Sequence, residues 1–99
     1  MYTWIERRKV NIERLPETMQ RAQSDFFPKL QQAHGFSSFS VVSDQENGIN
    51  TAIVIWESKA HADAFADANS GWMQTLEQFG HTLQSDNRGE VVIHLAPQQ

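Results

Sequence analysis

The chain has 99 residues, of which 12 are acidic and 8 basic, and it contains no cysteine. The net charge of −4 argues against a nucleic-acid partner, which requires a basic face to neutralise phosphates. The lack of cysteine excludes disulfides, thiolate catalysis and cysteine-bound metals. The length suits one domain spanning residues 1–99. No apolar run approaches the roughly 20 residues of a membrane span, and the start has no signal-peptide block. We therefore predict a cytoplasmic protein with no membrane partner.

The first two predicted elements are a strand and a long helix. Residues 2–10 are rich in aromatic and β-branched side chains, which is typical of a strand. Across residues 15–33, apolar side chains recur at alternating steps of four and three, which places them on one helix face. Pro28 lies inside this pattern and removes one backbone hydrogen bond. We predict a kink near residues 24–25, or alternatively two short helices.

A hairpin and a second helical region follow. Residues 36–43 and 51–57 are predicted strands, joined by a polar loop at 44–48 whose Asn-Gly step favours a tight turn. The second of these strands is apolar on both faces, so we expect it to be central in the sheet. Ser58 is a predicted N-cap for a helix over residues 59–69.

The last part of the chain is predicted to contain one more helical stretch and one strand. Apolar residues at helical spacing begin at Trp72, and this stretch is expected to end near Gly80. Residues 86–89 are predicted to be a loop. Residues 90–95 are apolar on both faces and are predicted to be the last strand.

The predicted order is β-α-β-β-α-β, which favours an α+β, ferredoxin-like sandwich with a four-stranded antiparallel sheet of order 4-1-3-2. Helices can cover only one face of such a sheet, yet several strands carry large apolar residues on both faces. We therefore expect a second copy of the chain to cover the other face, giving a dimeric α/β barrel. The predicted interface residues are Trp4, Val54 and Trp56. The alternative is a monomer whose tryptophans lie under its own C-terminal tail.

Residues 55–65 read Ile-Trp-Glu-Ser-Lys-Ala-His-Ala-Asp-Ala-Phe. This segment resembles the antibiotic biosynthesis monooxygenase-like (ABM) family of the dimeric α/β barrel superfamily. In that family a strand often ends in Trp-Glu-Ser-Lys, and an aromatic residue follows about nine positions after the tryptophan. The resemblance implies a homodimer. The family includes cofactor-free oxygenases of polycyclic phenols, quinol oxygenases and haem-degrading oxygenases.

The resemblance does not extend to the haem-degrading branch. That branch uses an asparagine on the first strand, a tryptophan on the second helix and a histidine on the following helix. The matching positions here are Arg7, Phe65 and a position near Leu76. Because all three differ, haem degradation is not expected.

The sequence shows no pattern for a metal or a bound cofactor. Its four histidines lack metal-ligand spacing, and no Gly-rich phosphate loop, nucleophile elbow or dinucleotide fingerprint is visible. We predict no metal and no cofactor. His94, on the predicted last strand, is a candidate general base because its ordinary pKa is near neutral. The alternative is a structural histidine whose hydrogen bonds are satisfied.

An aromatic pocket between helices and sheet is the remaining candidate site. The predicted substrate-binding residues are Ile5, Phe26, Leu30, Ile53, Ile55, Phe65, Leu76 and Phe79. Arg7 is the predicted catalytic cation, holding a phenolate or carboxylate by charge pairing. Alternatively, it pairs with Glu6, Glu13 or Glu57. Trp72 is the third predicted catalytic residue, and core packing is its alternative role.

Two functions follow from the residues and the resemblance. The first is a cofactor-independent monooxygenase of a small phenolic or quinol-type compound, in which the ionised substrate itself reduces O2. In such an enzyme the protein lowers the pKa of the substrate and excludes water. The second is a non-catalytic small-molecule binding or dimerisation domain, which the lack of a recognisable acid-base pair favours. Enzymatic activity is thus left open at this point.

Overall fold

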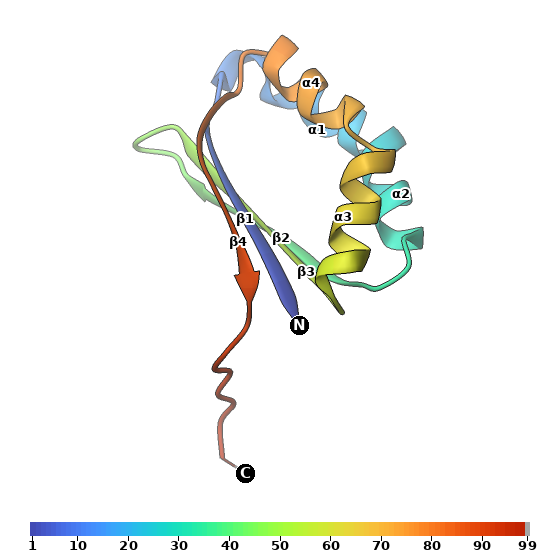
Figure 1. Ribbon diagram of the computed structural model, residues 1–99. Coiled ribbons are helices and arrows are strands. Elements are labelled where there is room, and N and C mark those ends of the chain that lie inside the picture. Colours follow the sequence, from blue (N-terminus) through green and yellow to red (C-terminus); the bar gives the residue numbers. More distant parts are fainter. Residues whose placement is uncertain (99) are drawn as a thin grey trace.

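The strands form one antiparallel sheet in the order β2-β3-β1-β4. This is the predicted order 4-1-3-2, counted from the opposite edge. The computed structural model describes residues 1–98. The strands are β1 (Tyr2–Lys9), β2 (Phe36–Asp44), β3 (Ile49–Trp56) and β4 (Thr82–Glu90). All helices lie on one face of the sheet, as Figure 1 shows, so the α+β ferredoxin-like prediction is confirmed.

The helical layer is made from two interrupted helices. Its members are a 3-10 turn (Ile12–Arg14), α1 (Leu15–Arg21), a π-helical turn (Ala22–Phe26), α2 (Phe27–Gln32), α3 (Lys59–Ala68) and α4 (Gly71–Gln78). The π-helical turn lies where Pro28 predicts a kink. Pro28 has no N–H to give to the preceding turn, and the Phe27 N–H reaches back five residues to the Ala22 carbonyl.

The connection from α2 to β2 and the start of α3 meet at one point. The Ser58 hydroxyl accepts a hydrogen bond from the His61 backbone N–H, which confirms the predicted N-cap. Gly35 has a positive φ of 76°, and a side chain there would collide with the ring of His61. The Gly35 carbonyl also accepts a hydrogen bond from the Glu57 N–H at 2.8 Å. A glycine is therefore required for this close approach.

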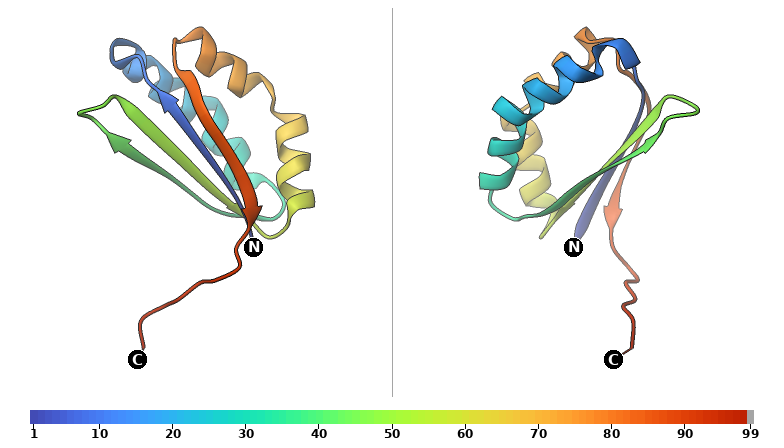
Figure 2. Two further views of the ribbon diagram at one scale, coloured as in Figure 1. Left: turned by 60° about the vertical axis from the view of Figure 1, so that its left-hand side comes forward. Right: turned by 180° about the vertical axis from the view of Figure 1, so that it is seen from behind.

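The prediction for the C-terminal region is wrong. Residues 86–89 are not a loop but part of β4, which pairs with β1 from Thr82 to Glu90. Residues 91–98 form no strand, and their side chains are exposed. The reason is the length of β1. Because β1 begins at Tyr2, pairing ends with a hydrogen bond from the Val91 N–H to the Met1 carbonyl. Figure 2 shows the tail leaving the sheet beyond that point.

The predicted assignment of side chains to the two sheet faces is also wrong. Directly paired residues share a face, and neighbours along a strand alternate. Trp4 pairs with Val54, and both line the space under the helices together with Trp56. Ile5 pairs with Ile53 and Thr3 with Ile55, so these isoleucines lie on the opposite, open face. The predicted interface tryptophans therefore face the helices.

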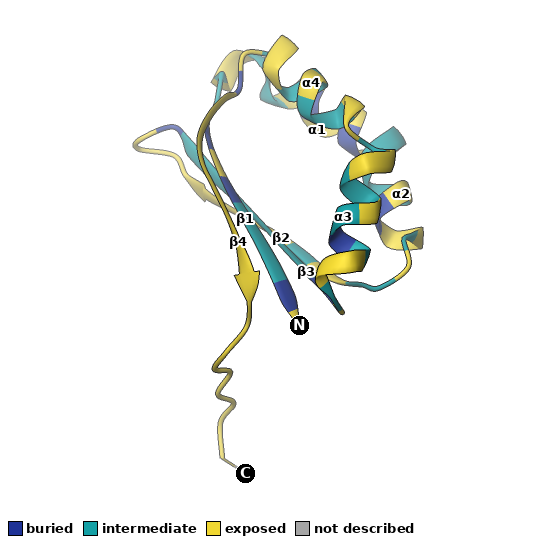
Figure 3. Cartoon of the chain, in the orientation of Figure 1, coloured by how far each residue is buried: buried dark blue, intermediate teal, exposed yellow. Residues whose placement is uncertain are grey.

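The buried core lies at one end of the covered face. Its centre is Tyr2, Leu30, Trp56 and Ala62, with phenylalanine rings packed around it. Trp56 is 1% exposed and contacts rings from the sheet and from α3 at centroid distances of 5.9 and 5.2 Å. Figure 3 shows buried positions on both the sheet and the helices, whereas β4 and the tail are exposed throughout.

Candidate functional site

A cavity with two adjoining lobes lies between the helices and the covered sheet face. The aromatic lobe, named for Trp4, Trp56, Phe65 and Trp72 in its wall, has a volume of about 450 Å³. The polar lobe, named for Glu6, Arg8, Thr18, Asn50 and His81, has about 130 Å³. Both are also lined by Phe26, Phe39, Ala52 and Leu76. The larger lobe is within the roughly 300–1,000 Å³ range of small-molecule sites.

Aromatic rings from several elements build the wall of the aromatic lobe. Trp72 from α4 stacks on Phe26, with ring centroids 4.7 Å apart and planes inclined by 7°. Phe26 is the last residue of the π-helical turn, so the change in helix geometry before Pro28 positions this ring. Phe39 and Phe65 approach Phe26 edge-on at 5.9 and 6.0 Å. Such walls offer flat apolar contact to a planar ring.

A guanidinium lies at the β4 side of the aromatic lobe. The Arg88 guanidinium carbon is 3.5 Å from the centroid of the Trp4 ring. Arg88 also donates to both carboxylate oxygens of Asp86, at 3.1 and 3.2 Å, and this hydrogen bonding raises the pKa of the guanidinium. The buried indole N–H groups of Trp4 and Trp56 have no hydrogen-bond partner among the described residues. Two residues of the cavity wall therefore each keep a buried donor without an acceptor.

An ion pair is buried beside the polar lobe. Glu6 and Arg8 are 9% and 5% exposed, and Arg8 Nε donates to Glu6 Oε1 at 2.6 Å. Arg8 Nη1 donates to the His81 carbonyl at 2.9 Å, and Nη2 lies 3.9 Å from the Met73 sulfur. The two charged residues are two positions apart on β1, which places both side chains under the helices. Removing one partner of such a buried pair destabilises the fold, because the other charge is left buried without compensation.

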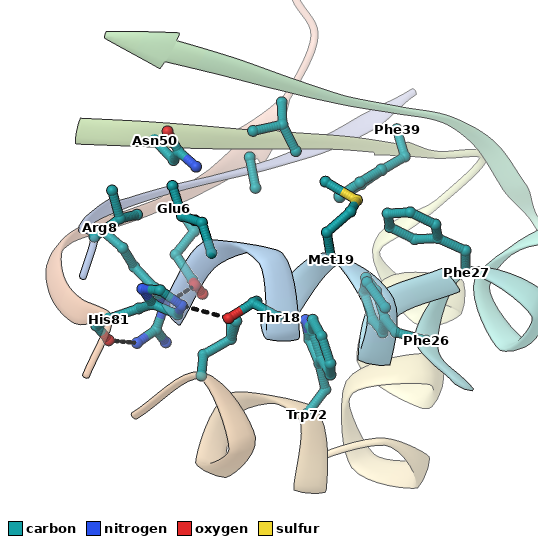
Figure 4. A pocket seen from close by; sticks show the side chains of 16 residues that line it. Glu6, Arg8, Thr18, Met19, Phe26, Phe27, Phe39, Asn50, Trp72 and His81 are labelled. Carbon is teal, nitrogen blue, oxygen red and sulfur yellow. Dashed lines mark hydrogen bonds and ion pairs between the residues drawn. The ribbon is translucent and has the colours of Figure 1, made fainter. Parts of the chain in front are cut away.

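The ring of His81 is held between two hydrogen-bond partners, and Figure 4 shows the one to Thr18 within the polar lobe. Its Nδ1 accepts a hydrogen bond from the Asn11 N–H at 3.1 Å, so the proton is on Nε2. Nε2 then donates to the Thr18 hydroxyl at 2.7 Å, and this hydroxyl donates to the Arg14 carbonyl at 2.9 Å. Burial, followed by the charges of Arg8 and Arg14, lowers the pKa of His81. Both ring nitrogens are therefore occupied.

Five of the predicted site residues line the cavity: Phe26, Leu30, Phe65, Trp72 and Leu76. Ile5, Ile53 and Ile55 do not, because they project from the open face. Phe79 lies outside the cavity lining, with the Arg14 guanidinium 4.8 Å above its ring. The chemical roles of all these residues remain predictions.

The two other predicted catalytic residues lie away from the cavity. Arg7 is exposed on the open face, where Thr51 and Ser85 are its cross-strand neighbours. Over residues 1–98 it forms no ion pair, so the predicted pairing with a nearby glutamate is absent too. His94 is exposed in the C-terminal tail. Sequence analysis missed Glu6 and Arg8, although their spacing of two, on a strand that begins with aromatic residues, places them on the Trp4 face.

The described part of the chain shows no other obvious site. Within residues 1–98, no group of three or more His, Asp or Glu side chains is arranged to hold a metal. No helix in the same range is long and apolar enough to cross a membrane.

Comparisons with known proteins establish the fold. No family model matches the sequence, and no curated protein matches it. A solved structure from Deinococcus radiodurans, provisionally named an antibiotic biosynthesis monooxygenase, has a TM-score of 0.78 at 12% identity over 100% of both chains. A variant of SnoaB, a cofactor-independent oxygenase from Streptomyces nogalater, has a TM-score of 0.70 at 12% identity over 97% of both chains. A conserved protein from Methanosarcina mazei Go1 has a TM-score of 0.70 at 15% identity over 89% of this chain and 87% of its own. The chain therefore has the fold of the antibiotic biosynthesis monooxygenases, as its sequence resemblance implies.

Proposed function

We propose that this chain is a cofactor-independent monooxygenase of a small aromatic compound of phenolic or quinol type. The observation that carries the proposal is the aromatic lobe, a cavity of about 450 Å³ with a stacked Trp72–Phe26 pair in its wall and buried charges beside it. Its fold is shared with a cofactor-independent oxygenase, which gives the chemistry a precedent.

A quinol-type substrate can supply every electron that the reaction needs. One oxygen atom of O2 is added to a ring carbon, and the other leaves as water with two substrate hydrogens, so a hydroquinone yields a hydroxyquinone. The substrate loses four electrons and O2 gains four. The protein's part is to hold the ring, favour its ionised form and exclude water. Trp72 and Phe26 provide the walls, and the Arg88 guanidinium provides the positive charge that the sequence analysis assigned to Arg7.

Oxygen consumption tests this proposal. We expect the wild-type chain to consume O2 with at least one member of a panel of hydroquinones and anthrone-like phenols. Trp72→Ala removes a wall and should lower kcat/KM by roughly 10-fold or more, as expected for a misplaced substrate. Arg7→Ala, on the open face, is the control and should leave uptake unchanged. Absence of uptake by the wild type across the panel would contradict the enzymatic proposal.

A non-catalytic binding domain is the second candidate. The occupation of both ring nitrogens of His81 favours it, because this is the histidine that lines the cavity and it cannot act as a base without losing a hydrogen bond. Ligand binding without oxygen uptake would select this candidate.

We also propose that a second copy of the chain covers the open sheet face. Ile5, Ile53 and Ile55 lie on the central strands β1 and β3 of that face, and no element of residues 1–98 packs over them. A contiguous aliphatic surface on the centre of a sheet is typical of an interface. The experiment is the solution mass at micromolar concentration, where a single-protomer mass would contradict a homodimer.

A further inference from the structure

Most polar groups of the polar lobe are hydrogen-bonded to one another. Each side-chain nitrogen of Arg8 makes one contact: Nε with a carboxylate oxygen of Glu6, Nη1 with the His81 carbonyl and Nη2 with the Met73 sulfur. The His81 N–H is donated to Thr18, and the Thr18 hydroxyl is donated to a backbone carbonyl. A ligand carboxylate at this point would lie beside the buried carboxylate of Glu6, and like charges repel each other.

One strong acceptor, the second carboxylate oxygen of Glu6, is left over. Only Oε1 of Glu6 is used by Arg8, and no other hydrogen bond to this carboxylate exists within residues 1–98. The side-chain oxygen of Asn50, which also lines the polar lobe, is buried without a partner. A buried acceptor without a donor is costly, and more so when it is charged. The unused carboxylate oxygen of Glu6 is thus complementary to a ligand group that donates a hydrogen bond.

Glu6 is placed to meet a ligand held in the aromatic lobe. It is only 9% exposed, and its side chain lines both lobes. Figure 4 shows its side chain among the residues that surround the polar lobe, on the sheet side of Trp72 and Phe26. A ring stacked along the aromatic wall can therefore direct one substituent towards the carboxylate.

We propose that Glu6 is the specificity-determining residue of the cavity and accepts a hydrogen bond from a neutral hydroxyl of the ligand. This inference rests on the cavity of the proposed function and adds the orientation in which the ring of the ligand is bound. The hydroxyl end of the ring lies at the polar lobe, and the rest of the ring lies along the aromatic wall. A carboxylate or an ether at the Glu6 end is rejected, because it would place an acceptor against an acceptor.

Three naphthalene probes with one ring system test the inference by equilibrium dialysis: 2-naphthol, 2-methoxynaphthalene and 2-naphthoate. The wild-type chain should bind 2-naphthol roughly 10- to 100-fold more tightly than the ether, the range expected for a hydrogen bond to a charged group. The ether is the more apolar probe, so burial alone predicts the opposite order. The naphthoate should bind more weakly than 2-naphthol.

Variants assign the preference to one side chain. In Glu6→Gln the preference for 2-naphthol over the ether should fall to a few-fold or less, while affinity for the ether stays the same. A purely structural role would weaken both probes together. Arg7→Ala, at the next position on the opposite face, is the control and should keep the wild-type ratio. Should Glu6→Gln fail to fold, the wild-type comparison of the three probes still decides the matter.

The outcomes separate this inference from the proposed function. Equal or tighter binding of the ether or the naphthoate would overturn the role of Glu6 and leave the cavity as a ligand site. Failure of every probe to bind would overturn both. Selective binding of 2-naphthol without oxygen uptake from any phenol would support the inference together with the non-catalytic candidate.

Discussion

The two faces of β1 carry different kinds of side chain. The covered face carries Tyr2, Trp4, Glu6 and Arg8, whereas the open face carries Thr3, Ile5, Arg7 and Lys9. The same holds for β3, whose isoleucines at positions 53 and 55 lie on the open face. The face with the more core-like aliphatic residues is thus the one without helices. We infer that the covered face is shaped for a ligand and the open face for packing.

The largest expected effect comes from removing one charge on the covered face. Arg8→Met leaves the Glu6 carboxylate buried without its cation, and breaking a buried pair in this way costs about 3–5 kcal/mol. The matched control is Arg21→Met, the same substitution at an exposed position of α1, away from the open face. We expect urea denaturation to show a change below about 1 kcal/mol for the control. Equal losses in the two variants would refute the importance of the buried pair.

The next effect concerns the open face. Ile53→Asp places a charge at the centre of the proposed interface and should raise the dimer dissociation constant about 100-fold, as for an interface hot spot. Analytical ultracentrifugation measures it. The control is Ser40→Asp, at the directly paired position on the edge strand β2, where the effect should be smaller. A dimer unaffected by Ile53→Asp would show that association uses another surface.

A pH-dependent effect distinguishes the polar lobe from the tail. Burial lowers the pKa of His81 below its ordinary value of 6.5, so the unfolded chain binds this proton more readily than the folded one. The stabilisation by neutral His81 is complete above pH 6.5 and is lost as the pH falls through the folded-state pKa. We expect the unfolding free energy to fall from pH 7.5 to 5.5, and His81→Gln to flatten this dependence. His94→Gln, in the exposed tail, should leave the slope at its wild-type value.

The smallest expected effect is in the C-terminal tail. Val92 is 88% exposed and lies beyond the last hydrogen bond between β4 and β1. Val92→Ser should therefore change the unfolding free energy by less than about 0.5 kcal/mol in thermal or urea denaturation. A larger loss in the dimer, but not in an Ile53→Asp monomer, would place the tail in the interface.

Much of the fold could be predicted because local signals determine it. Pro28 predicts the interruption between α1 and α2, and Ser58 predicts the start of α3. The hairpin between β2 and β3 follows its Asn-Gly loop. These features depend on backbone chemistry within a few residues and are independent of what packs on them. The aromatic wall could also be predicted in part, since Phe26 and Trp72 belong to apolar helix faces.

The last strand could not be predicted from its own residues. Its nine residues from Thr82 to Glu90 are mainly polar and exposed, whereas the apolar residues that follow match the sequence pattern of a strand more closely. An edge strand is held by backbone hydrogen bonds on one side only, so its side chains are weakly constrained. Pairing with β1, rather than side-chain pattern, determined where β4 lies.

The sequence by itself determined the order of elements and the sheet topology, because turn, cap and periodicity signals act over short distances. Only the tertiary structure decided which face of the sheet the helices cover. A strand with large side chains on both faces carries no preference of its own, and shifting the choice by one residue exchanges every side chain between the faces. That choice moved Arg7 and the isoleucines to the open face and brought Glu6 and Arg8 into the cavity.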